Sequence, residues 1–249
     1  MRDYLFKEGF YGKPGNVARV DDGEHETIEQ QYTPLELAAM SPITDNRALG
    51  RIIGVLHDRK QSDAVRNEAI NLLRKSKYEG LCENLFRILD DANEGERFRR
   101  FCVQHLGIEM ENANVQQREA IRAVLHSSIS DRHAAVRREA LLALVNAGVP
   151  GAEEIVLDWL TKKDDDGVRD IAIRCAYKLH LRDQIPLIRK YLYDANEVVR
   201  IAAIVTLSEW GDEDNRPAFE AAAKSMSVRL QRAGKAALER LDQQNEQDQ

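Results

Sequence analysis

The chain has 249 residues, of which 43% are apolar, 31% charged and 6% aromatic, and its 36 basic and 42 acidic residues give a formal net charge of −6. The apolar fraction allows a sizeable core and excludes a wholly disordered chain, and no apolar run reaches the roughly 18 residues of a membrane span. The start of the sequence lacks an apolar stretch of signal-peptide length, and the three cysteines show no CxxC spacing. Together these features predict a reduced, cytoplasmic compartment.

Residues 1–46 differ in composition from the rest of the chain and predict an irregular N-terminal arm. They hold four glycines, three of the six prolines and five of the fifteen aromatic residues. Thr33, Pro34 and Glu36 have the order of a capping box with proline at the first helical position, so a short helix LELAAM is expected there. Either the arm folds over the first repeat as a cap, or it docks on a partner protein through aromatic anchors. The candidate anchors are Tyr4, Phe6, Phe10 and Tyr11.

A helical pattern recurs at steps of 31 to 38 residues through residues 47–242. Its copies begin at Val65, Phe98, Val136, Val168, Val199 and Leu230. If the first residue of a copy is position zero, then positions 4, 7, 8 and 11 are small or apolar, which is the period of a helix and not of a strand. A second apolar helix precedes each copy, so each repeat is expected to be a helix A, a short turn and a helix B. A repeat of this length cannot bury its own apolar faces, and stacked repeats form an α-solenoid.

The last copy offers two registers. Val228 begins a Val-Arg pair like those of earlier copies, but counting on from it gives a poor core pattern. Counting from Leu230 also places Pro217 13 residues upstream, as Pro186 stands 13 residues before Val199. The register from Leu230 is therefore predicted, and it places on the inner face Gly234, Ala237, Leu238 and Leu241.

The fragments VRREALLALVNAG at Val136, VRDIAIRCAYKL at Val168 and VRIAAIVTLSEW at Val199 resemble HEAT repeats of the type named after phycobilisome lyases, with a pattern of roughly D-x-x-x-VR-x-x-A-x-x-AL. The resemblance covers about residues 47–242 and implies an all-α superhelix of about six HEAT-like helix pairs. A polar tail at 243–249 is expected to follow. The resemblance is specific for the fold and unspecific for the function.

An arginine follows position zero in five copies: Arg66, Arg99, Arg137, Arg169 and Arg200. One interpretation is a basic ladder that binds nucleic acid. The other is structural, because in solenoids of this kind such an arginine typically bonds an acidic residue of its own or the adjacent turn. Acidic residues stand a few positions upstream of four of them: Asp63, Asp131, Asp166 and Asp194. The structural interpretation is favoured and predicts a ladder of charged hydrogen bonds.

In such folds helix B lines the concave surface, so its outward positions are candidates for contact with a partner. The apolar side chains at these positions are Phe101, Leu142, Val145, Ile171, Tyr177, Ile201 and Val205. For each of them the alternative is lateral packing between adjacent B helices. As a set they predict an apolar groove with a rim of mixed charge, which is typical of a protein interface.

A search for reactive groups gives no catalytic constellation. No HExxH, GxSxG or glycine-rich phosphate loop occurs, and the only His-Glu pair, His25-Glu26, lies outside the repeats. A diiron site like that of the HEAT enzymes similar to deoxyhypusine hydroxylase is therefore unsupported. Cys102 and Cys175 fall at inner positions of helix B and are predicted core thiols, whereas Cys82, on a helix A, is expected to be partly exposed.

The sequence thus predicts a non-catalytic protein–protein interaction module, a scaffold, adaptor or inhibitor that holds a partner protein in the concave groove, without metal or cofactor. The first alternative follows from the resemblance and is a lyase-like role that attaches or removes a bilin on an antenna protein, although no residue matches a chromophore site. The second is nucleic-acid binding, against which the acidic net charge of −6 argues.

Overall fold

The structure is a computed structural model, and it describes residues 32–162 and 167–247. Within these residues all regular elements are helices, so the predicted all-α fold is confirmed. None of the described helices combines the length and the apolarity that a bilayer crossing requires. The chain divides into two compact units, Met1–Ala143 and Leu144–Gln249.

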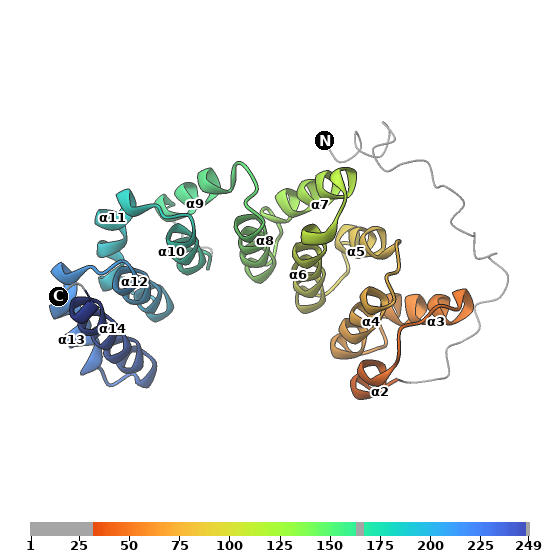
Figure 1. The fold of residues 1–249 in the computed structure, drawn as a ribbon, viewed down its shortest axis with the longest axis horizontal. Coiled ribbons are helices and arrows are strands. Elements are labelled where there is room, and N and C mark those ends of the chain that lie inside the picture. Colours follow the sequence, from red (N-terminus) through yellow and green to blue (C-terminus); the bar gives the residue numbers. More distant parts are fainter. Residues whose placement is uncertain (1–31, 163–166, 248–249) are drawn as a thin grey trace. The chain divides into compact units, whose positions relative to one another are not determined.

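The described part of the first unit contains one short helix followed by helices in A–B order (Figure 1). These helices are α2 (Pro34–Ala39), α3 (Asn46–His57), α4 (Asp63–Lys75), α5 (Leu81–Asp90), α6 (Glu96–Asn112), α7 (Val115–Ser128) and α8 (Ala134–Asn146), whose last turn belongs to the second unit. Helix α3 packs against α4, and α5 packs against α6. The B helices α4 and α6 also contact each other, so neighbouring pairs stack directly.

The second unit repeats the same arrangement (Figure 1, green to blue). Its helices are α9 (Ala152–Thr161), α10 (Arg169–Lys178), α11 (Ile185–Lys190), α12 (Glu197–Glu209), α13 (Arg216–Ala223) and α14 (Val228–Gln247). Short 3-10 helices η1, η2 and η3 cover Arg182–Gln184, Tyr191–Tyr193 and Glu213–Asn215. The B helices α10, α12 and α14 pack side by side in that order. Across the described residues the six predicted helix pairs are therefore present.

Small side chains allow these helices to approach closely. Position 4 of the six B helices holds Ala69, Cys102, Ala140, Ala172, Ala203 and Gly234, all of them buried. At Gly234 a Cβ atom would lie 2.4 Å from the backbone nitrogen of Ala223 and 2.7 Å from the carbonyl oxygen of Phe219, both in α13. Only glycine fits this crossing. The register counted from Leu230 is confirmed, because Val228 is 59% exposed while Ala237 and Leu241 are buried.

The short helix α2 has the predicted capping box. The backbone N–H of Glu36 donates to the Thr33 hydroxyl oxygen at 3.2 Å, and the N–H of Thr33 donates to Glu36 Oε2 at 2.7 Å, with Pro34 in the first turn. Helix α2 packs against α4, and Lys75 Nζ donates to the carbonyl oxygen of Met40 at 2.7 Å. The end of the predicted arm is thus attached to the first helix pair. The four aromatic anchors at residues 4–11 lie outside the described residues.

The C-terminal end differs from the predicted boundary at residue 242. Helix α14 continues to Gln247, so most of the expected polar tail is helical. Asn245 Nδ2 donates to Glu213 Oε1 at 2.6 Å, and Arg216 Nη2 donates to Asp242 Oδ1 at 2.9 Å. Polar side chains of the last turns therefore find partners in η3 and at the start of α13, in their own helix pair, which a composition-based boundary does not reveal.

Candidate interaction surfaces

Arg66 is the most enclosed of the five repeated arginines, with 2% of its surface exposed. Its Nη1 and Nη2 donate to the two carboxylate oxygens of Glu94 at 3.0 and 2.7 Å, and its Nε donates to the carbonyl oxygen of Leu56 at 2.8 Å. The guanidinium carbon lies 3.6 Å from the ring centroid of Phe98. Burial alone raises the pKa of Glu94, but the hydrogen bonds from Arg66 and from the Gly95 N–H outweigh it and hold the pKa below its usual range.

Arg99 and Arg169 also reach acidic residues in the turn of the next helix pair. Arg99 Nε donates to Asp131 Oδ2 at 3.0 Å, and Arg169 Nη1 donates to Asp194 Oδ2 at 3.3 Å. The partner of Arg66 is Glu94, 28 residues later, and not the nearby Asp63. The fourth predicted acid, at residue 166, lies outside the described residues.

Arg137 and Arg200 bond the backbone of their own turns. Arg137 Nη1 donates to the carbonyl oxygens of Asp131 and Arg132 at 3.0 and 3.3 Å. Arg200 Nη1 donates to those of Asp194 and Ala195 at 2.6 and 2.9 Å. The five arginines therefore join and close turns of the chain.

The predicted groove residues fall into two groups. Val145 and Ile171 are only 7% and 9% exposed, so they pack between helices and offer little surface to a partner. The other five predicted groove residues are half-buried: Phe101, Leu142, Tyr177, Ile201 and Val205. Lateral packing between helices therefore accounts for Val145 and Ile171. The half-buried residues keep part of each side chain accessible.

In the first unit, Phe101 lies on the solvent side of α6 between two arginines. The guanidinium carbons of Arg97 and Arg100 lie 5.7 and 5.5 Å from its ring centroid. Both arginines are exposed, and among the described residues neither has a carboxylate within ion-pair distance. We call Arg97, Arg100, Phe101 and the exposed Gln104 the α6 surface. The spacing of one and four residues along a helix is visible in the sequence, and the structure shows that both arginines lie near the ring.

The neighbouring carboxyl group on α8 belongs to Glu139. It is half-buried, and burial raises its pKa, with Arg100 and Arg138 acting in the opposite direction. Arg100 is therefore close enough to act on Glu139 electrostatically, although the two form no ion pair. Glu139 occupies position 3 of α8, as Phe101 does in α6, so the two side chains lie at equivalent places on adjacent B helices.

A polar network fixes α6 against α4. Arg74 bonds both Glu109 and the Nδ1 atom of His105, and His105 Nε2 lies 2.9 Å from Asn67 Oδ1. Arginine only donates, so Nδ1 is the acceptor and the ring proton sits on Nε2 and points to Asn67. Burial, followed by the charge of Arg74, lowers the pKa of His105 to about 3. This histidine is a neutral structural group that orients the B helices.

In the second unit, the predicted groove residues that stay partly accessible lie on α10 and α12. Tyr177 and Trp210 place their ring centroids 6.0 Å apart with an interplanar angle of 52°. Ile201 and Val205 lie one turn apart on α12, each half-buried. Arg240 Nη1 of α14 donates to the Ser208 hydroxyl at 2.8 Å, which closes the adjacent part of the surface with polar groups.

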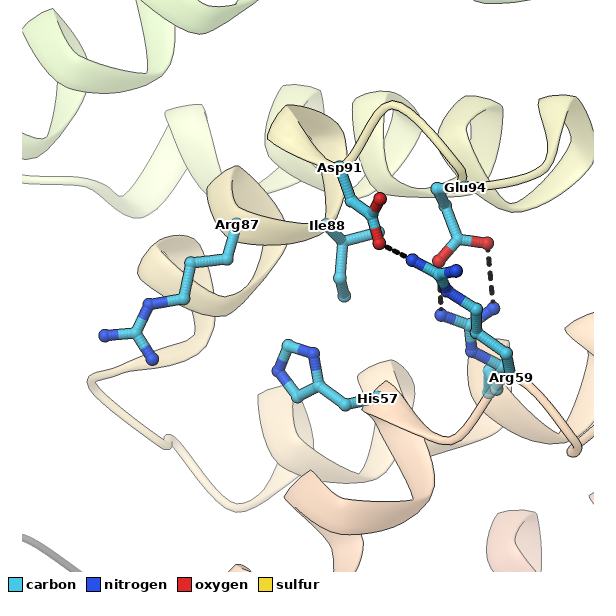
Figure 2. A pocket seen from close by; sticks show the side chains of 7 residues that line it. His57, Arg59, Arg87, Ile88, Asp91 and Glu94 are labelled. Carbon is cyan, nitrogen blue, oxygen red and sulfur yellow. Dashed lines mark hydrogen bonds and ion pairs between the residues drawn. The ribbon is translucent and has the colours of Figure 1, made fainter.

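A cavity of about 380 Å³ opens at the turns of the first two helix pairs (Figure 2). It is lined by His57, Arg59, Arg66, Arg87, Ile88, Asp91 and Glu94. A dashed line in Figure 2 joins Arg59 to Asp91, and His57 and Arg87 lie apart from both acids. Glu94 is paired with Arg66. His57 Nε2 lies 2.7 Å from Asn84 Oδ1. Most charges of this cavity therefore neutralise one another.

The three cysteines are free and buried. The expectation that Cys82 is partly exposed is wrong, because it is 8% exposed at the wall of a second cavity of about 440 Å³. Burial, and then the carboxylates Glu109 and Glu83, raise the pKa of Cys82 to about 12. Burial also raises the pKa of Cys175 to about 12 and that of Cys102 further still. A nucleophilic thiolate at neutral pH requires the opposite shift.

The chain is similar to several solved structures and matches one family model. Among solved structures, an engineered protein is 16% identical and matches over 79% of this chain and 97% of its own, with a TM-score of 0.47. A designed armadillo repeat protein in complex with the peptide (KR)4 is 18% identical over 78% of this chain and 99% of its own, with a TM-score of 0.45. None of the curated proteins matches. The family model of HEAT repeats matches residues 96–176 and 154–239, together more than half of the chain, and the chain therefore belongs to the HEAT-repeat family.

Proposed function

We propose that this protein is an interaction module, a scaffold, adaptor or inhibitor, that binds a partner protein on the exposed surface of its B helices. The observation that carries the proposal is Phe101, a half-buried aromatic ring flanked by the exposed arginines Arg97 and Arg100. Aromatic and arginine side chains contribute most of the binding energy in many protein interfaces, and a cation over a ring adds to it. The half-buried Tyr177, Ile201 and Val205 support a second contact area in the other unit.

A role without catalysis is part of the proposal. It is supported by the surroundings of the cysteine thiols and of His105, which are residue types that often carry covalent or acid–base chemistry. The three thiols are buried with raised pKa values, and both ring nitrogens of His105 are occupied by Arg74 and Asn67. These groups pack and orient helices, and none of them is poised to attack a substrate.

The finer predictions from the sequence stay predictions. They are the phycobilisome-lyase type of the repeat, the bilin-related activity that it implies, and a cytoplasmic location. Incubation with a bilin and an apo-antenna protein, followed by visible absorbance, tests the second. For nucleic acid the structure gives less support than for a protein partner, because the repeated arginines bond carboxylates and carbonyl groups of the chain itself.

Site-specific photo-crosslinking tests the proposed function. A photoreactive p-benzoyl-phenylalanine replaces Phe101 in one variant and Tyr177 in another, and each protein is irradiated in extract of its own cells. The control carries the same group at Val115, which is 79% exposed on the A helix α7.

A discrete protein adduct at position 101 or 177, and not at 115, is the expected result. The same adducts at all three positions, or none at 101 and 177, contradict the proposal. Recovery of an adduct at 115 alone would instead place the interface on the A helices.

A further inference from the structure

We infer that the α6 surface binds an acidic, partly apolar segment of the partner protein. The inference rests on the proposed function and adds the chemistry of the partner. The guanidinium groups of Arg97 and Arg100 both lie near the ring of Phe101.

Within the described residues Arg97 and Arg100 form no ion pair, and Glu96, the acid nearest to them on α6, lies 3.6 Å from His133 Nδ1 instead. Arg97 and Arg100 stand three residues apart, a spacing at which like charges on a helix repel each other. By contrast, the half-buried Arg122 of α7 bonds Glu119 on its own helix, and Arg216 of α13 bonds both Glu213 and Asp242. A carboxylate that binds between Arg97 and Arg100 removes the repulsion and gains charge-assisted hydrogen bonds.

The apolar part of the α6 surface is Phe101, and Leu142 on the neighbouring B helix α8 is a second apolar side chain. Both are half-buried, and Leu142 occupies position 6 of its repeat, as Gln104 does in α6. Helices α6 and α8 approach closely nearby, where a Cβ on Gly107 would lie 3.0 Å from the Cβ of Ala143. A ligand that places apolar side chains beside its carboxylates therefore meets the Phe101 ring between the arginines and one aliphatic side chain on the next B helix.

The partner is inferred to be a protein segment and not a nucleic acid because acidic side chains of this chain interrupt the positive charge. Glu139 lies at the equivalent place on α8, and the exposed Glu96 adjoins Arg97. A phosphate backbone needs a continuous surplus of cations on one face. Two arginines around a ring instead match one or two carboxylates of a peptide, a recognition mode known for acidic motifs.

The test uses the full-length protein and two fluorescein-labelled peptides of equal length, one alternating glutamate with leucine and the other alternating lysine with leucine. Fluorescence anisotropy is expected to show binding of the glutamate peptide only, weaker as salt is added. The double variant Arg97→Glu and Arg100→Glu should weaken this binding by roughly tenfold or more.

The matched control reverses the same two charges elsewhere. Arg47 and Arg51 are exposed on the A helix α3, so the double variant Arg47→Glu and Arg51→Glu should change the affinity less than about twofold. Phe101→Ala should weaken binding with little change in its salt dependence, because it removes apolar contact and not charge. Circular dichroism on each variant confirms that the helices are retained.

Three outcomes overturn the inference. The first is equal affinity for both peptides, and the second is an equal loss of affinity in the Arg47→Glu and Arg51→Glu control. The third is binding of the glutamate peptide only after residues 1–31 are deleted, because the chain's own segment would then be the occupant. A specific photo-crosslinked adduct at position 101 without glutamate-peptide binding overturns only the acidic chemistry. If neither a specific crosslinked adduct nor glutamate-peptide binding is observed, the proposed function is contradicted as well.

Discussion

Arg66 and Glu94 form a buried bidentate ion pair that joins the first helix pair to the second. Arg66 comes from α4, Glu94 from the turn before α6, and the two side chains are 3% and 6% exposed. Each guanidinium nitrogen has an acceptor, and Glu94 Oε1 also accepts from the Gly95 N–H at 3.0 Å. A pair this enclosed matters most when one member is removed, because the other is then left as a buried charge.

We therefore predict that Glu94→Ala lowers the free energy of unfolding by about 3–5 kcal/mol in urea denaturation. Replacing both members with apolar residues, Arg66→Met with Glu94→Leu, should recover much of this loss, since no buried charge remains. Glu83→Ala on the exposed side of α5 serves as a control and should change stability by less than about 0.5 kcal/mol. An equal effect of Glu83→Ala and Glu94→Ala would show that the pair has no special role.

His105 makes stability depend on pH above the range where carboxylates titrate. Its folded pKa of about 3 lies below the ordinary value of 6.5, so between these values the unfolded chain binds the proton and the folded chain does not. Stability contributed by the neutral ring is complete above pH 6.5 and declines as the pH falls below it.

Urea denaturation from pH 8 to pH 5 should show this decline in the wild type. In His105→Gln the slope should be clearly smaller, because glutamine does not titrate. In NMR spectra the ring signals of His105 should stay constant over the same range; a titration near pH 6.5 would contradict the buried network.

Two glycines should respond to alanine with opposite sign. At Gly234 the new Cβ meets the backbone of α13 at 2.4 Å, so Gly234→Ala is expected to cost about 1–3 kcal/mol or more. At Gly50, inside α3, no heavy atom lies within 4 Å of the added Cβ, so Gly50→Ala should gain about 0.5–1 kcal/mol from helix propensity. Thermal unfolding of the two variants compares them directly. A stabilising Gly234→Ala would rule out the tight α13–α14 crossing.

The cysteines should be unreactive in the native protein. Because all three are buried with raised pKa values, Ellman's reagent at pH 8 is expected to react slowly without denaturant and with three thiols in urea. Cys82 is the most exposed of them at 8%, so it should react first as denaturant is added. Rapid labelling of one native thiol would contradict the buried placement of Cys82 in the wall of its cavity.

The sequence by itself determined the elements that depend on local pattern. The apolar period marked the B helices, the small residue at position 4 marked their crossings, and the capping box at Thr33 marked the start of α2. The choice of Leu230 over Val228 was possible because the inner face of a helix repeats every three to four residues whatever lies around it. These signals act over a few residues and need no knowledge of the fold.

Only the tertiary structure decided which side chains meet. Arg66 bonds Glu94 and not Asp63, because stacking brings the turn of the next helix pair closer than the acid three residues upstream. The same stacking buries Val145, Ile171 and Cys82, which the pattern placed outward or left partly exposed, and it leaves Phe101 accessible between two arginines. The repeat pattern gives every copy the same outward positions. The packing of the neighbouring repeats determines which side chains at these positions reach solvent.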